Sequence, residues 1–113
     1  MPFIDSKVTV KLSEEEKEFI KEKLGRKIEV FGKTENWLML GFEDQYDLYF
    51  AGKKMERAAY VSVRLYGKVS DDACNAFTAA VCDVFEEMLG IPASAVYVSY
   101  LTTNQWGWNG GIF

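Results

Sequence analysis

The chain has 113 residues, 49% of them apolar, and a formal net charge of −4. This length suits one domain, residues 1–113, with enough apolar residues to fill a core. An acidic chain without a basic face is poorly suited to phosphates, and no apolar run reaches the ~18 residues of a membrane span. We therefore expect neither a nucleic acid nor a membrane as partner.

The first ten residues predict a strand and no targeting segment. Met1-Pro2-Phe3-Ile4-Asp5 contains no basic stretch followed by an apolar one, so no signal peptide is visible. We expect a cytoplasmic protein, or one released by a route that needs no signal peptide. Residues 2–10 alternate, with Ile4, Val8 and Val10 on one side, which is typical of a strand.

A helix and a buried strand follow. Ser13 and Glu16 have the spacing of a capping box, and apolar residues then recur at helical spacing until Gly32 ends the helix. The continuous apolar run 37–42 predicts a strand buried on both faces. Residues 43–57 are expected to form a polar loop around a short apolar piece.

The second half repeats this order. Residues 60–66 predict a strand, Ser70 begins a helix that Gly90 closes, and residues 95–101 predict another strand. Ser13 and Ser70 lie 57 residues apart, so the chain reads as two β-α-β repeats in one α/β fold. We expect one four-stranded sheet with two helices on one face, and parallel pairing of the strands joined through each helix.

Two helices cover only one face of such a sheet, yet two of its strands are predicted to be apolar on both faces. In a chain of one domain, another copy of the same protein is the natural cover for the second face. The sequence therefore predicts an oligomer.

The residues that are absent restrict the chemistry. The chain has no histidine, which excludes Ser–His and Cys–His nucleophile pairs and histidine-containing metal sites. Cys74 and Cys82 are eight residues apart on one predicted helix, about 12 Å along its axis, so they cannot form a disulfide with each other. No phosphate-binding glycine loop is present, and we predict no metal and no cofactor. A base acting at neutral pH must be a carboxylate, lysine, tyrosine, cysteine or the terminal amine.

Four segments together resemble one known family. They are Met1-Pro2, Gly32-Lys33, the stretch Val96-Tyr97-Val98-Ser99-Tyr100 and the ending Trp106-Gly107-Trp108-Asn109-Gly110-Gly111-Ile112-Phe113. In this order and at these spacings they resemble the macrophage migration inhibitory factor family of tautomerases, over almost the full length. The resemblance implies a homotrimer in which three sheets wrap into a barrel with the helices outside. It also implies active sites between subunits that tautomerise small aromatic keto or enol acids, phenylpyruvate-like or dopachrome-like.

The resemblance also implies roles for individual residues. Pro2, as the terminal residue, is the base, Lys33 helps bind the substrate carboxylate or enolate oxygen, and Tyr97 enters from the neighbouring subunit. Burial in an apolar pocket and a nearby Lys33 would both lower the pKa of the proline amine, which leaves it neutral and able to accept a proton. The expected substrate-binding residues are Phe3, Trp37, Tyr66, Ser99, Trp108 and Phe113.

Three departures from the family pattern stand out. Ser99 replaces the asparagine of better-known members, which shortens or removes a pocket hydrogen bond. Tyr66 stands where isoleucine is common, which narrows the pocket. Ala58 and Val61 occupy the approximate place of the CxxC motif of the vertebrate cytokine, so thiol-dependent activity is not expected.

Structural alternatives remain open for each residue. Pro2 is an ordinary second residue if Met1 is retained, because its nitrogen is then an amide. Lys33 has the alternative of a solvated lysine at a helix end, Tyr97 that of a core strand residue, and Trp106 and Trp108 that of structural anchors of the tail. The alternative function is a cytokine-like interaction protein that binds a host receptor, with vestigial or incidental tautomerase activity. A general small-ligand binding module is a third.

Overall fold

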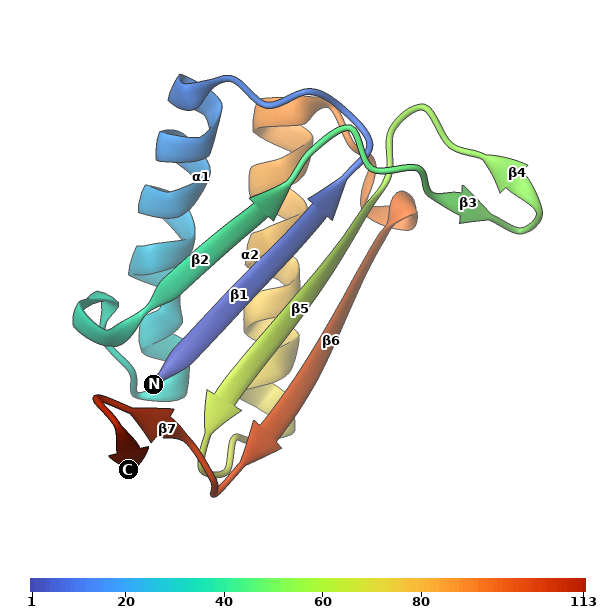
Figure 1. Cartoon of the computed structure of the whole chain (residues 1–113). Helices are drawn as coiled ribbons and strands as arrows, with labels where there is room; N and C mark the ends of the chain where they lie inside the picture. Colours follow the sequence, from blue (N-terminus) through green and yellow to red (C-terminus); the bar gives the residue numbers. More distant parts are fainter.

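The computed structural model describes all residues, 1–113, and contains one four-stranded sheet with two helices packed against one face (Figure 1). The strand order is β2-β1-β5-β6. The bounds of the main elements are β1 Pro2–Val8, α1 Glu14–Lys27, β2 Met39–Glu43, β5 Ala59–Tyr66, α2 Asp71–Leu89 and β6 Val96–Thr103. The α/β fold predicted from the sequence is thereby confirmed.

The pairing of the strands confirms the two β-α-β units. β1 and β2, joined through α1, run parallel, as do β5 and β6, joined through α2. The two units meet where β1 and β5 pair antiparallel at the centre of the sheet, with Pro2 opposite Leu65 and Val8 opposite Ala59.

The smaller elements lie at the two ends of this sheet. They are the 3-10 turns η1 Ile28–Phe31, η2 Glu35–Trp37 and η3 Ala93–Ala95, and the hairpins of β3 Tyr49–Phe50 with β4 Lys53–Lys54 and of β7 Gly107–Trp108 with β8 Gly111–Ile112. The β3–β4 hairpin projects beyond one end of the sheet, whereas both termini lie together at the opposite end (Figure 1).

The helix boundaries follow from their caps. Ser13 accepts a hydrogen bond from the Glu16 backbone N–H, and the Glu16 side chain accepts one from Ser13, which confirms the predicted capping box. Ser70 caps α2, and Gly90 ends it with φ of 66°, a left-handed conformation that favours glycine. Neither helix is long and apolar enough to cross a membrane.

The core lies between the sheet and the two helices. Alternate residues of β1 and β5 point toward the helices and are buried. The largest fully buried side chains are Phe77, Phe85, Ile4, Ile20, Leu24, Ile28, Leu65 and Ile91. One face of the sheet is therefore buried against the two helices, and neither helix packs on the opposite face.

Three predicted boundaries were wrong. The α-helical bonding of α1 stops at Lys27 and the chain tightens into η1 before Gly32, whose φ of 71° completes the turn. β1 ends at Val8, where the chain leaves the sheet toward α1. Trp37 lies in a 3-10 turn and not in the strand, because its ring packs on the C-terminal tail instead of the core.

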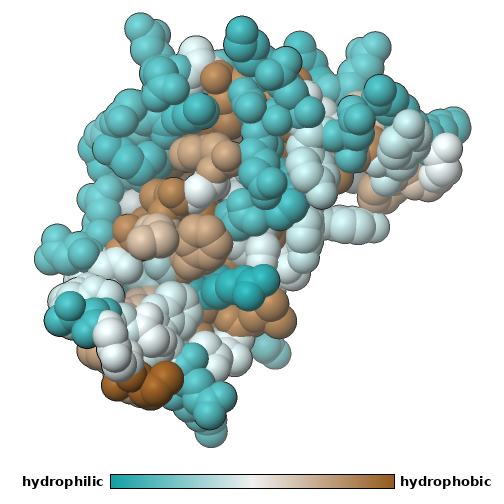
Figure 2. Space-filling view, viewed as in Figure 1, coloured by the Kyte–Doolittle hydropathy of each residue, from teal (hydrophilic) through white to brown (hydrophobic).

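The face of the sheet away from the helices is mixed in character. Its centre carries an ionic cluster in which the Lys7 ammonium lies 2.8 Å from an Asp5 oxygen and 3.0 Å from a Glu43 oxygen. Large apolar side chains are exposed toward its edges, with Met39 68% and Leu101 53% exposed. Figure 2 shows this face as apolar patches between hydrophilic residues. In one copy of the chain, this apolar surface is uncovered.

Candidate active site

A cavity of about 780 Å³ opens at the end of the sheet where the termini lie. Its walls come from the N-terminus, η2 and the start of β2, β5, the end of β6, and the C-terminal tail. The lining residues are Met1, Pro2, Phe3, Asn36, Trp37, Leu38, Met39, Arg64, Leu101, Thr102, Thr103, Gln105, Trp106, Gly107 and Trp108. This volume suits a small organic molecule.

Four of the residues predicted for the site meet in this cavity: Pro2, Phe3, Trp37 and Trp108. Pro2 is buried, whereas both indole rings are half exposed. The rings of Trp37 and Trp108 contact edge to face, with their centroids 5.1 Å apart. Together with Phe3 they form an apolar wall beside the N-terminus that suits a planar aromatic group.

Three further predicted residues form a second group next to the cavity, although none of them lines it. Lys33 donates a hydrogen bond of 2.8 Å from its ammonium to the Tyr66 carbonyl oxygen. The Tyr66 ring contacts that of Phe113 edge to face, with the two ring centroids 5.4 Å apart. Tyr66 therefore packs against the tail and is not among the residues that line the cavity of this chain.

The backbone of Tyr66 joins this second group to the N-terminus. Its N–H donates to the Met1 carbonyl oxygen at 3.2 Å, while its own carbonyl accepts from Lys33. Lys33 is half buried, so it is not the freely solvated lysine of the structural alternative. The backbone of Tyr66 is thus hydrogen-bonded both to Met1 and to the ammonium of Lys33.

The terminal amine has an altered acidity. Burial lowers the pKa of the Met1 amine from its ordinary value of 8.0, and the positive charge of Lys33 lowers this pKa further. Both causes disfavour the charged form. At this position a larger fraction of an amine is therefore neutral near pH 7 and able to accept a proton.

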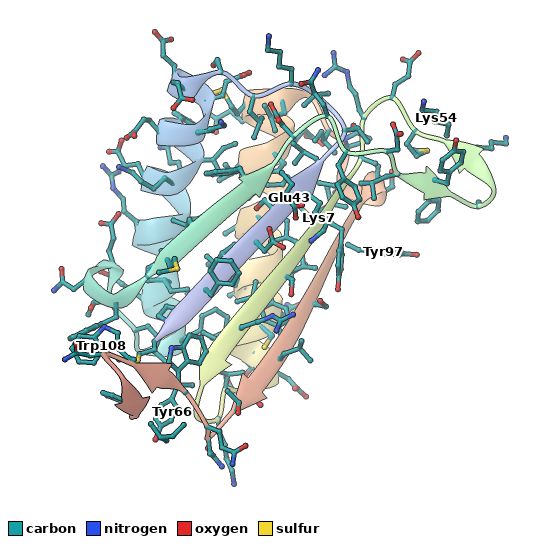
Figure 3. The ribbon with its side chains drawn as sticks, viewed as in Figure 1. Lys7, Glu43, Lys54, Tyr66, Tyr97 and Trp108 are labelled. Carbon is teal, nitrogen blue, oxygen red and sulfur yellow. The ribbon has the colours of Figure 1, made fainter.

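Tyr97 and Ser99 lie near the other end of the sheet. Pro2 is opposite Leu65, which is paired with Thr102, so Tyr97 is five residues away along the sheet, roughly 16 Å. Tyr97 is 63% exposed, which excludes the core alternative for this copy of the chain. Its ring contacts Phe50 of the projecting hairpin, centroids 5.4 Å apart. Figure 3 shows Tyr97 far from Tyr66 and Trp108.

Ser99 is engaged with a neighbouring strand. Its hydroxyl lies 2.6 Å from the Tyr60 hydroxyl, and the two form a hydrogen bond. A single chain therefore does not bring Tyr97 or Ser99 to Pro2. The sequence prediction assigned Tyr97 to the neighbouring subunit, and this geometry leaves that as the only way for it to act beside Pro2.

The sequence interpretation missed one charged residue of the cavity, Arg64. The alternation of β5 was its signal, because Val63 and Leu65 face the core and Arg64 must face away. Trp106 also lines the cavity, and its carbonyl accepts a 2.7 Å hydrogen bond from the Phe113 N–H that closes the tail.

Both cysteines, by contrast, lie on α2, where burial raises the pKa of each thiol.

The chain has the architecture of the tautomerase-fold class. Two β-α-β units form one sheet, two helices cover one face of it, and a cavity lies at the N-terminus. The family model of macrophage migration inhibitory factor (MIF) matches residues 1–113, and the chain belongs to this family. Membership supports an activity of the tautomerase kind, and members of the family are generally oligomeric.

Individual relatives agree with this assignment. The crystal structure of Leishmania major MIF2 superposes with a TM-score of 0.93 at 31% identity, covering 100% of this chain and 97% of that one. The MIF homologue of Prochlorococcus marinus has a TM-score of 0.86 at 26% identity, over 98% of both chains. The MIF of Xenopus laevis is 33% identical over 64 residues, which span 55% of this chain and only 56% of the frog protein.

Proposed function

We propose that this protein is a keto–enol tautomerase of phenylpyruvate-like or dopachrome-like compounds, with Pro2 as its base. The observation that supports the proposal is the surroundings of the N-terminus. The N-terminus lies at an aromatic cavity, and burial and Lys33 together lower the pKa of its amine. An amine with these surroundings is suited to accept a proton from carbon near neutral pH.

The proposal requires removal of Met1. In the chain as translated the Pro2 nitrogen is an amide, which has no basic lone pair. After processing, the same nitrogen is a secondary amine, and Pro2 is more deeply buried than Met1. The two causes that lower the pKa of the Met1 amine would then act on the proline.

The reaction then needs only a proton relay. The neutral Pro2 nitrogen accepts a proton from C3 of the 2-oxo acid, and the C–H electron pair becomes the C2=C3 double bond. The carbonyl electrons move to the oxygen, which takes the proton back from the prolinium to give the enol. The reverse sequence returns the ketone. Lys33 has two ammonium protons left beyond its bond to Tyr66, and they can stabilise the oxyanion.

A trimer would complete the site. Residues 1–113 act as one domain in this proposal, and Tyr97 of each copy would serve the Pro2 of its neighbour. Its exposed ring, together with the exposed Met39 and Leu101, supports burial against another copy of the chain. Burying a fully exposed Leu or Met side chain contributes about 1.5–3 kcal/mol, so Met39 and Leu101 would each contribute a part of this amount.

The direct test compares two forms of the protein. Mass spectrometry of the purified protein is expected to show loss of Met1, and this form should accelerate the decay of phenylpyruvate enol absorbance. A form that retains Met1, released from a fusion by a protease, should be at least about 10²-fold slower, since it lacks the base. Equal rates in the two forms would exclude Pro2. If the processed form shows no turnover, the tautomerase is excluded, and the cytokine-like interaction protein and the small-ligand binding module are the hypotheses that remain.

The pH dependence tests the role of Lys33. The neutral amine is the base, so kcat/KM should rise with pH around a midpoint that lies below the ordinary pKa of a terminal amine, because burial and Lys33 lower this pKa. Lys33→Met removes a positive charge, so the amine pKa should rise and the pH profile shift to higher pH. Lys33→Arg keeps the charge and should leave the midpoint in place. A midpoint unmoved in Lys33→Met would contradict the role of Lys33 in tuning the amine.

A further inference from the structure

The charges that line the cavity have one sign. The chain has 17 acidic and 13 basic residues, yet no aspartate or glutamate lines the cavity. Its only charged side chain is that of Arg64. A cavity whose one charged side chain is cationic, in a protein that is acidic as a whole, favours an anion.

Arg64 lines this cavity from β5, next to the strand that begins at Pro2. It pairs with Phe3 on β1 and with Leu101 on β6, and both of these neighbours also line the cavity. The next residue, Leu65, is opposite Pro2. Directly paired residues have their Cβ atoms about 5 Å apart, so the arginine stem lies beside Phe3 on the open face.

The guanidinium of Arg64 has no partner within the chain. The other two arginines are engaged, Arg26 with the Glu22 carboxylate at 2.6 Å and Arg57 with the Leu89 carbonyl at 2.6 Å. The carboxylates on the same face, Asp5 and Glu43, are both taken by Lys7. Arg64 therefore keeps its full set of donors for a molecule that enters the cavity.

We propose that Arg64 binds the carboxylate of the substrate and thereby selects 2-oxo acids over their neutral analogues, an inference that rests on the proposed function. A guanidinium matches a carboxylate with two parallel hydrogen bonds, which a lysine cannot do. Arg64 and Tyr66 flank Leu65 in β5, and the Tyr66 carbonyl holds Lys33. The two cations thus lie on either side of the strand position opposite Pro2.

In this arrangement Arg64 and Lys33 bind different groups of the substrate. A 2-oxo acid has its carboxylate and its carbonyl oxygen on adjacent carbons, so each needs a separate positive partner. With the carboxylate on Arg64, the remaining protons of Lys33 are free for the oxygen that becomes negative during enolisation. The aromatic end of the substrate then lies against Trp37 and Trp108.

The test uses a pair of ligands that do not react. 3-Phenylpropanoate and its uncharged amide differ in charge but hardly in shape, and their binding to the processed protein is measured by NMR titration. In Arg64→Gln, binding of the acid should weaken about 10-fold or more, with binding of the amide unchanged, since the charge-assisted hydrogen bonds to the carboxylate are lost. Arg64→Lys should restore part of the loss. Equal weakening of both ligands, or no weakening of the acid, would overturn the proposal.

A matched control and a second readout complete the experiment. Arg26→Gln removes the same charge from an exposed helix position and should not change either affinity. In turnover, Arg64→Gln should raise KM for phenylpyruvate with little change in kcat. If Arg64→Gln does not assemble, the comparison rests on the unsubstituted protein, where equal affinity for acid and amide would refute the proposal.

Failure of this proposal is distinct from failure of the proposed function. Ligand binding does not require proton transfer, so selective loss of acid binding in a protein without turnover would leave Arg64 as an anion-binding residue and exclude the tautomerase. Conversely, efficient turnover with an unchanged KM in Arg64→Gln would exclude Arg64 and retain the tautomerase.

Discussion

Replacing Pro2 with glycine is expected to lower kcat/KM for phenylpyruvate by about 10²- to 10⁴-fold, the usual contribution of a positioned general base. Glycine is also small enough for removal of Met1, so the variant keeps a terminal amine. It loses the ring that holds the nitrogen in one direction at the start of β1 and shields it from water. The remaining amine is mobile and hydrated, so its pKa should return toward the ordinary value and its position should vary.

The measurement is steady-state decay of the enol, with subunit assembly monitored by sedimentation. The only other proline, Pro92, precedes η3 and does not line the cavity, so Pro92→Gly is the matched control and should retain full activity. A Pro2→Gly variant that assembles normally and retains its activity would show that the base is another group.

Mixing two defective variants is expected to restore activity if each site draws on two chains. Tyr97→Phe should lower kcat/KM by about 10- to 100-fold, because one donor to the developing oxyanion is lost. Pro2→Gly is defective for a different reason and has an intact Tyr97. When equal amounts are unfolded together and refolded as trimers, about a quarter of the sites should combine an intact Pro2 with an intact Tyr97 from the neighbour.

The recovered activity should therefore approach a quarter of that of the unsubstituted protein, well above the activity of either variant alone. The two proteins mixed without unfolding provide the baseline, because their subunits have not exchanged. Tyr49→Phe, on the same projecting hairpin that contacts Tyr97 through Phe50, is the matched tyrosine control and should be fully active. No gain after refolding, with mixed trimers present, would show that Tyr97 is not supplied by a neighbouring chain.

The capping motifs and alternation patterns predicted most of the fold. Ser13, Ser70 and Gly90 marked helix boundaries correctly, because a cap is satisfied by backbone groups within a few residues. The antiparallel junction between β1 and β5 joins residues more than fifty positions apart, and no local pattern specifies it. The position of Trp37 was mispredicted for the same reason, since its ring contacts Trp108, seventy-one residues further along.

The candidate site was predictable in part. The resemblance pointed to Pro2 and Trp108, and the aromatic character of Phe3 and Trp37 added these two residues; all four line one cavity. The sequence interpretation did not include Arg64, whose proposed role depends on its having no ion-pair partner in the folded chain. Nor could it show that the Tyr66 backbone links Lys33 to the N-terminus, because this depends on which carbonyl lies within 2.8 Å of the ammonium.

The sequence by itself determined the α/β class, the two repeats and the absence of histidine-based chemistry, since composition and short-range periodicity suffice for these. Only the tertiary structure decided which side chains share a cavity, what charge that cavity carries, and that Tyr97 lies too far from Pro2 to act on it within one chain. The reason is physical: a site is assembled from the ends of separate strands, and distances between strands depend on pairing and register, which act across the whole chain.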